Sequence, residues 1–135
     1  LGLSEALVLA RDAGRARDSL GELADALGVR VVFGGLERPA VGEYDVLLSV
    51  LPVAVDRALA DALVPGASVV FDVRYGHGPS SYADAAEAFD VQVIDGIEML
   101  AAQAAVQVRL MTGHDCPVEP LADAARAELT RRNSR

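Results

Sequence analysis

Three residues in the second half of the chain could together contact a small ligand. Gly96, Met99 and Gln103 are spaced i, i+3, i+7 in a segment with helical periodicity, so they share one stripe of the helix. This stripe predicts a ligand-facing surface. The other interpretation is a core helix, whose apolar face would consist of Ile97, Leu100, Ala101, Ala104, Val108 and Met111. A core helix does not explain Gln103, because a buried amide needs hydrogen-bond partners.

A basic turn follows the first apolar run, residues 6–10. It contains Arg11, Asp12 and Arg15, and a helical pattern begins there. At the tip of the second strand of a dinucleotide-binding fold, an acidic side chain binds a free ribose 2′-hydroxyl, whereas arginines bind a 2′-phosphate. The two arginines therefore favour NADP, and the helix N-terminus is a second attraction for an anion. The alternative is a solvated surface turn in which Asp12 and Asp18 pair with the arginines.

Two further turns follow apolar runs. In the first turn, Ser49 and Leu51 precede Pro52, which is expected to begin a helix that Ser49 could cap. In the second, Tyr75 offers a phenol and His77 an imidazole, although a histidine between glycines is more typical of an exposed loop. Neither a serine–histidine–aspartate set nor a metal-ligand spacing occurs in the chain, so we expect no metal site.

Alternating strands and helices would have to position these turns. The expected strands are residues 6–10, 29–33, 45–50, 68–73 and 91–95, and the expected helices are residues 15–27, 53–63, 80–89, 97–112 and 117–132. Ala16, Leu20, Leu23 and Leu27 share one face of the first helix. The strands are near-continuous apolar runs, which is typical of parallel strands covered on both faces. The sequence thus predicts a doubly wound (Rossmann-like) α/β fold followed by two C-terminal helices.

Composition narrows the class of protein. The chain has 135 residues, of which 52% are hydrophobic and 24% charged, as in a globular domain. No apolar run is long enough for a membrane helix, and a net charge of −8 with 4% aromatic residues disfavours nucleic-acid binding. The single Cys116 fits a reducing cytoplasm. All twelve basic residues are arginine, so the chain can perform no lysine chemistry.

The first residues predict an incomplete fold. Leu1-Gly2-Leu3-Ser4 is typical of the end of a helix, and no G-x-G-x-x-G motif occurs in the chain. We therefore expect that the first strand and the Gly-rich loop of the fold are missing. With the strand order 3-2-1-4-5-6, the strands at residues 6–10 and 45–50 would flank an empty central position.

Taken in order, these motifs resemble the C-terminal, cofactor-binding half of shikimate dehydrogenases over nearly the whole chain. The family's Asn-Arg-Thr-like turn and the basic residue after it correspond to Ala10, Arg11, Asp12 and Arg15. Its Asn-Ala-Thr-Pro turn corresponds to Ser49-Val50-Leu51-Pro52, with other side chains at the first three positions. Its D-x-x-Y-x-P-x-x-T and G-x-x-M-L-x-x-Q motifs correspond to Asp72, Tyr75 and Ser80 and to Gly96, Met99, Leu100 and Gln103, with His77 in place of the proline.

The resemblance implies an oxidoreductase that uses NADP to interconvert 3-dehydroshikimate and shikimate, on the chorismate route of aromatic amino-acid biosynthesis. The cofactor-binding residues would be Ala10, Arg11, Asp12, Arg15, Ser49, Leu51, Val73, Gly96 and Met99. Val73 and Gly96 would lie beside the nicotinamide, and Met99 would pack on its ring. Tyr75 and Gln103 would contact the substrate.

The resemblance also implies parts that this chain lacks. Residues 1–95 would form a partial NADP-binding domain, and residues 96–135 a helical segment that packs back toward an N-terminal substrate domain. That domain would hold the catalytic Lys/Asp pair, so this lysine-free chain would be inactive alone, in a protein that is a monomer or homodimer. Alternatives are a non-catalytic NADP-binding or regulatory module, a quinate/shikimate dehydrogenase, or a folate-linked dehydrogenase.

Overall fold

The computed structural model describes residues 2–37, 39, 41–76 and 80–134. The chain forms two compact units, Leu1–Gly42 and Glu43–Arg135. Parallel strands alternate with helices in both of them, which confirms the predicted α/β class. No helix among the described residues is both long and apolar enough to cross a membrane. His77 lies outside the described residues.

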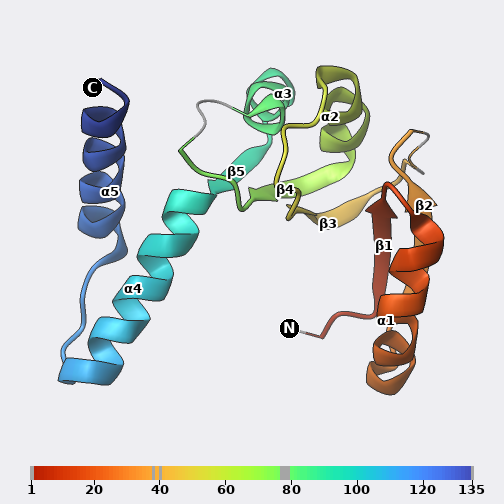
Figure 1. Cartoon of the computed structure of the whole chain (residues 1–135), viewed down its shortest axis with the longest axis horizontal. Helices are drawn as coiled ribbons and strands as arrows, with labels where there is room; N and C mark the ends of the chain where they lie inside the picture. Colours follow the sequence, from red (N-terminus) through yellow and green to blue (C-terminus); the bar gives the residue numbers. More distant parts are fainter. Residues whose placement is uncertain (1, 38, 40, 77–79, 135) are drawn as a thin grey trace. The chain divides into compact units, whose positions relative to one another are not determined.

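The first unit is a strand, a helix and a parallel strand (Figure 1). β1 (Glu5–Ala10) pairs with β2 (Arg30–Gly35) from Glu5↔Arg30 to Ala10↔Gly35. The connecting helix α1 (Ala13–Leu27) ends at Gly28, whose positive φ of 65° lets its N–H bond to helix carbonyls. The expected strands and helix are thus present, and the helix begins two residues earlier than its periodicity predicted.

The face of α1 that packs inward differs from the predicted one. Leu20, Leu23 and Leu27 are 40%, 55% and 67% exposed, whereas Ala24 is buried. A sheet of only two strands covers a narrow strip of helix, and this strip falls on small residues. The leucine face predicted from the sequence therefore remains largely open.

The second unit contains a parallel sheet of three strands in the order β3-β4-β5. The strands are β3 (Tyr44–Ser49), β4 (Ala67–Asp72) and β5 (Gln92–Asp95), and the helices are α2 (Arg57–Leu63), the short 3-10 helix η1 (Val64–Gly66), α3 (Ser81–Phe89), α4 (Gly96–Thr112) and α5 (Val118–Asn133). α2 and α3 lie on the same side of this sheet, and α4 and α5 form a hairpin after β5 (Figure 1). The pairings are those that the strand order 3-2-1-4-5-6 requires within this part of the fold.

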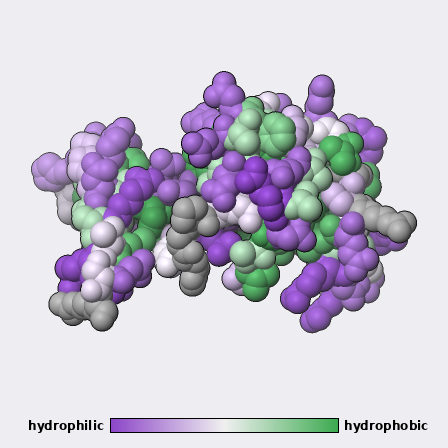
Figure 2. Space-filling view, turned by 90° about the horizontal axis from the view of Figure 1, so that it is seen from above, coloured by the Kyte–Doolittle hydropathy of each residue, from purple (hydrophilic) through white to green (hydrophobic). Residues whose placement is uncertain are grey.

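Two apolar clusters hold the second unit together. One lies between the sheet and α2 and α3, and its buried members are Ala60, Val64, Ala67, Val70, Tyr82, Ala85 and Ala86. The other is the seam of the α4–α5 hairpin, where Ile97, Ala101 and Ala122 are buried. On the opposite face of the sheet, Val46 and Leu48 are more than half exposed. Apolar side chains therefore reach the molecular surface in several places (Figure 2).

The N-cap residues of α3 and α2 determine where these two helices begin. α3 begins after Ser80, whose hydroxyl accepts the Ala83 N–H at 3.1 Å. The helix predicted from residue 53 begins only at Arg57, after Asp56 as its N-cap. The prediction that Pro52 begins the helix and that Ser49 could cap it is therefore wrong. Asp56 accepts the Leu59 N–H at 2.7 Å and lies four residues beyond Pro52, so this cap sets the start of α2.

Candidate functional site

The basic turn in the first unit joins the end of β1 to the start of α1. Asp12 is the N-cap of α1, and its carboxylate accepts the Arg15 N–H at 2.9 Å. Arg11 and Arg15 are both exposed. The surface-turn interpretation expected ion pairs with Asp12 and Asp18, but neither arginine forms an ion pair within the described part of the chain. Two guanidinium groups and a helix N-terminus can thus face an anion here.

In the second unit, the carboxyl ends of three strands meet at one edge of the sheet. Ser49 is in register with Asp72, and Asp72 with Asp95. Ser49 and Asp72 are buried, at 5% and 3% exposure. The Ser49 carbonyl accepts the Val73 N–H at 3.1 Å, so the turn after β3 is fixed to the loop after β4. Ligands of open α/β sheets bind at this edge.

Gly96, the first residue of α4, lies against this same loop. A Cβ at position 96 would be 2.3 Å from the Val73 carbonyl oxygen and 2.8 Å from that of Arg74. Backbone atoms cannot swing away as a side chain does, so only glycine fits without a shift of the chain. Gly96 is itself buried. Its lack of a side chain is therefore explained directly by this close packing, and less directly by the predicted ligand-facing stripe. The contact brings Ser49, Val73 and Gly96 together at the edge of the sheet.

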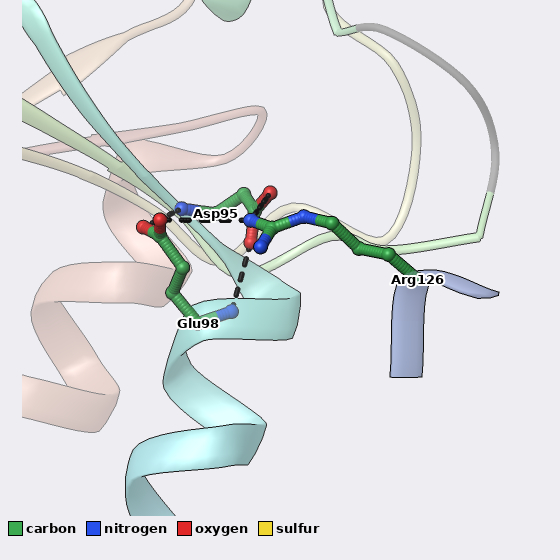
Figure 3. Close-up of polar contacts among 3 residues, drawn as sticks. All are labelled: Asp95, Glu98 and Arg126. Atoms are coloured by element: carbon green, nitrogen blue, oxygen red, sulfur yellow. Dashed lines mark hydrogen bonds and ion pairs between the residues drawn. The ribbon is translucent and has the colours of Figure 1, made fainter. Parts of the chain in front are cut away.

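The start of α4 is a capping box, and α5 reaches it through an arginine (Figure 3). The Asp95 carboxylate accepts the Glu98 N–H at 2.8 Å, and the Glu98 carboxylate accepts the Asp95 N–H at 3.4 Å. Arg126 donates to Asp95 Oδ2 at 2.9 Å, and the same nitrogen lies 3.5 Å from Glu98 Oε1. One guanidinium therefore bridges both carboxylates of the box.

Burial works to raise the pKa of the Asp95 carboxyl. The hydrogen bonds from the Glu98 N–H and from Arg126, together with the positive charge of Arg126, outweigh burial and hold the pKa of Asp95 below its usual value. Conversely, the Asp95 hydrogen bond raises the pKa of Arg126. The bridge therefore links two charged groups at neutral pH.

α4 turns opposite faces to α5 and to the surface. Ile97 and Ala101 pack in the seam with α5, whereas Met99 is half-buried and Gln103 is exposed. Gln103 borders a shallow hollow together with Ala102, Val106 and Gln107. The core-helix interpretation is thus correct for the seam but does not apply to Gln103. Met111, which was expected on the core face, is 84% exposed because it lies near the free end of the hairpin.

Tyr75 lies beside a cavity of about 390 Å³. The loop after β4, the end of β5 and the second half of α5 line it, and Arg74, Arg126, Thr130 and Asn133 contribute polar side chains. Tyr75 is half exposed and Gln103 borders the separate hollow on α4, so the two predicted substrate residues do not share one cavity of the second unit. Among the described residues, no group of His, Cys, Asp and Glu side chains could hold a metal ion.

Sequence reasoning proposed Gly96 and Met99 as cofactor-binding residues but missed the polar residues that the structure places at the start of the same helix. The pattern Asp95 to Glu98 before an apolar run is a capping-box signature and could have been recognised. Arg126 had no such signal, because it lies 31 residues away from Asp95. Only the packing of α5 on α4 brings it there.

Known proteins match this chain in sequence and in fold. The family described as shikimate 5′-dehydrogenase C-terminal domain matches residues 96–126. The shikimate dehydrogenase (NADP(+)) of Methanothermobacter thermautotrophicus is 31% identical over 138 residues, which cover 96% of this chain and 49% of that protein.

Solved structures give the same match. Mycobacterium tuberculosis shikimate dehydrogenase has a TM-score of 0.69 at 29% identity, over 94% of this chain and 48% of that one. The enzyme from Thermus thermophilus, solved with shikimate, has a TM-score of 0.64 at 26% identity, over 92% of this chain and 45% of that one. This chain spans about half the length of the relatives it matches.

Proposed function

We propose that this chain, which is a shikimate dehydrogenase C-terminal domain by sequence and fold, provides the NADP-binding half of an enzyme that interconverts 3-dehydroshikimate and shikimate. The observation that carries the proposal is the meeting of Ser49, Val73 and Gly96 at the carboxyl edge of the sheet. The resemblance to shikimate dehydrogenases assigns the same three positions to the cofactor. A curated relative named for NADP(+) matches almost the entire chain.

The arginine turn is the proposed site of the 2′-phosphate. Arg11 and Arg15 would donate to this group, while Ala10 and Asp12 shape the turn. Asp12 accepts the Arg15 N–H as the N-cap of α1, and among the described residues it forms no ion pair with either arginine side chain. Because guanidinium groups match a phosphate in charge and geometry, the turn favours NADP over NAD.

The edge of the second unit is the proposed site of the nicotinamide. Ser49 and Leu51 would border the cofactor, Val73 and Gly96 would lie beside the ring, and Met99 would pack on it. The cofactor would supply the hydride, and the chain would orient the ring against the substrate and exclude water. Glycine at position 96 lets the start of α4 lie against the Val73 and Arg74 carbonyls, so the helix and the loop stay together at this edge.

Tyr75 and Gln103 are the proposed substrate contacts, through a phenol and an amide that can hydrogen-bond hydroxyl or carboxylate groups. Both side chains are exposed. The outward face of α4, with Val106 58% and Leu110 80% exposed, is the proposed docking surface for an N-terminal substrate domain. That domain would supply the Lys/Asp pair that handles the hydroxyl proton, since the chain has no lysine. A cytoplasmic enzyme of aromatic biosynthesis is part of the same proposal.

Cofactor discrimination is the sharpest test of the arginine turn. Arg11→Ala should weaken NADP binding by about 1.5–3 kcal/mol, the scale of a hydrogen bond to a charged group, and leave NAD binding nearly unchanged. Arg17→Ala is the matched control, because it removes the same charge from α1 where the guanidinium lies 5.7 Å from the Phe33 ring centre. Titration calorimetry with NADP and with NAD measures the affinities of the wild type, Arg11→Ala and Arg17→Ala. Equal losses for NADP and NAD would refute the assignment of Arg11.

Activity separates the remaining candidates. A polypeptide that combines this chain with its substrate domain should oxidise shikimate with NADP, and the chain by itself should not. Binding of NADP without turnover of any related acid would favour the non-catalytic module instead. Faster turnover of quinate than of shikimate would favour the quinate/shikimate enzyme.

A further inference from the structure

The α4–α5 hairpin combines an apolar seam with a directional contact from Arg126. Ile97, Ala101 and Ala122 form the buried part of this seam. Val118, Leu121, Ala125 and Leu129 pack against these residues. Apolar contacts of this kind are non-directional, so they hold the two helices together without fixing one atom against another. The Arg126 bridge is different, because a charge-assisted hydrogen bond of 2.9 Å to Asp95 fixes both distance and orientation.

The bridge acts on the first turn of α4. Asp95 and Glu98 bond to each other's backbone N–H groups, so a cation shared by their carboxylates holds the whole turn (Figure 3). Met99 is the next residue along the helix, and Gln103 lies one turn further on the same side. Any rotation of the first turn would therefore move both side chains.

The end of α5 also lies beside the loop that carries Tyr75. A Cβ at Gly76 would be 3.6 Å from the Leu129 side chain, which places α5 against the loop. Arg126 and Leu129 both line the cavity next to Tyr75. One helix thus contacts the two segments that carry the proposed nicotinamide and substrate residues.

We infer that Arg126 is a positioning residue, which locks α5 to the capping box of α4 and thereby fixes Met99 and Gln103 against the nicotinamide and the substrate. The inference rests on the proposed function of this site. Arg126 itself touches neither reacting group. Its effect passes through Asp95 and Glu98, the only described carboxylates with which it pairs.

Hydrogen exchange tests the lock directly. In Arg126→Gln, which keeps a polar side chain but removes the charge, amides of residues 96–103 should exchange about three- to fivefold faster, the scale of a half-exposed ion pair. Arg132→Gln is the matched control on α5. Among the described residues, Arg132 forms an ion pair only with Glu128, which lies in the same helix at 2.8 Å. This control should leave the segment unchanged. Unchanged exchange in Arg126→Gln would overturn the inference.

Asp95→Asn provides a second variant that preserves the helix cap. Asparagine caps a helix as well as aspartate does but carries no charge for Arg126. Asp95→Asn should therefore reproduce most of the faster exchange, and adding Arg126→Gln to it should have little further effect. Fully additive effects of the two substitutions would also overturn the inference.

Kinetics distinguish positioning from a purely structural role. In the polypeptide that includes the substrate domain, Arg126→Gln should lower kcat about tenfold, because a misplaced contact weakens alignment of the reacting groups. The Kd for NADP should change less than about twofold, and Arg126→Lys should restore part of the loss in kcat. Faster exchange with an unchanged kcat would refute the positioning role. If the wild-type polypeptide oxidises no shikimate, the proposed function fails, whereas the exchange experiment still decides whether Arg126 locks α4.

Discussion

Replacement of Gly96 by alanine tests the closest backbone contact in the site. The added Cβ would lie 2.3 Å from the Val73 carbonyl oxygen and 2.8 Å from the Arg74 carbonyl oxygen. Ordinary contacts of this kind are about 3.4 Å or longer, so α4 and the loop would have to separate by roughly 1 Å. The loop resists such a shift, because the Val73 N–H bonds to Ser49 and the Arg74 N–H bonds to Asp72.

The expected cost follows from these constraints. Overpacking of this type destabilises by about 1–3 kcal/mol, and clashes with fixed backbone belong in the upper half of that range. Alanine recovers a fraction of this through its helix preference of up to about 1 kcal/mol over glycine. A net loss of about 2 kcal/mol is therefore expected in the free energy of unfolding of Gly96→Ala. Urea titration followed by circular dichroism measures it.

The control is the same replacement where space is open. At Gly21, within α1, no atom lies within 4 Å of the added Cβ, so Gly21→Ala should stabilise the chain by about 0.5–1 kcal/mol. The opposite signs of the two substitutions are the core of the test. A Gly96→Ala protein as stable as the wild type, with the same affinity for NADP, would refute the packing argument and with it the proposed role of this edge.

Three further outcomes are expected. Gln103→Ala, in the polypeptide with its substrate domain, should lower kcat/KM for shikimate with little change in the Kd for NADP; steady-state kinetics unaffected by the substitution would exclude a substrate contact. The folded-state pKa of Asp95 is depressed, so the stabilisation from its charged form is complete above its unfolded pKa of about 3.9 and is lost as pH falls through the lower folded value. In Asp95→Asn, the free energy of unfolding should therefore depend less on pH between about pH 6 and 2, as acid titration would measure. Asp12→Ala should destabilise α1 by about 1 kcal/mol, because it removes the N-cap, whereas Asp12→Ser should keep a capping oxygen and most of the stability. Thermal unfolding measures both variants, and similar stabilities for the two would count against the cap.

Much of the fold was readable because it depends on local chemistry. Within the described residues, the five predicted strands and the five predicted helices all occur near the segments that apolar runs and helical periodicity indicated. The errors lie where two local signals compete. Pro52 suggested a helix start, but Asp56 caps α2 and the helix begins at Arg57. The leucines of α1 suggested a buried face, but burial depends on how many strands lie beneath the helix.

The site divides in the same way. The sequence alone determined which residue types were available: two arginines after a strand, a Gly96/Met99/Gln103 stripe, and no lysine. Only the tertiary structure decided three further points. It determined that Gln103 is exposed, that position 96 has room only for glycine, and that Arg126 is the cation that contacts Asp95. The physical reason is distance along the chain. Periodicity and capping act over a few residues, whereas the contacts of Gly96 with Val73 and of Arg126 with Asp95 join segments 23 and 31 positions apart, which only packing can bring together.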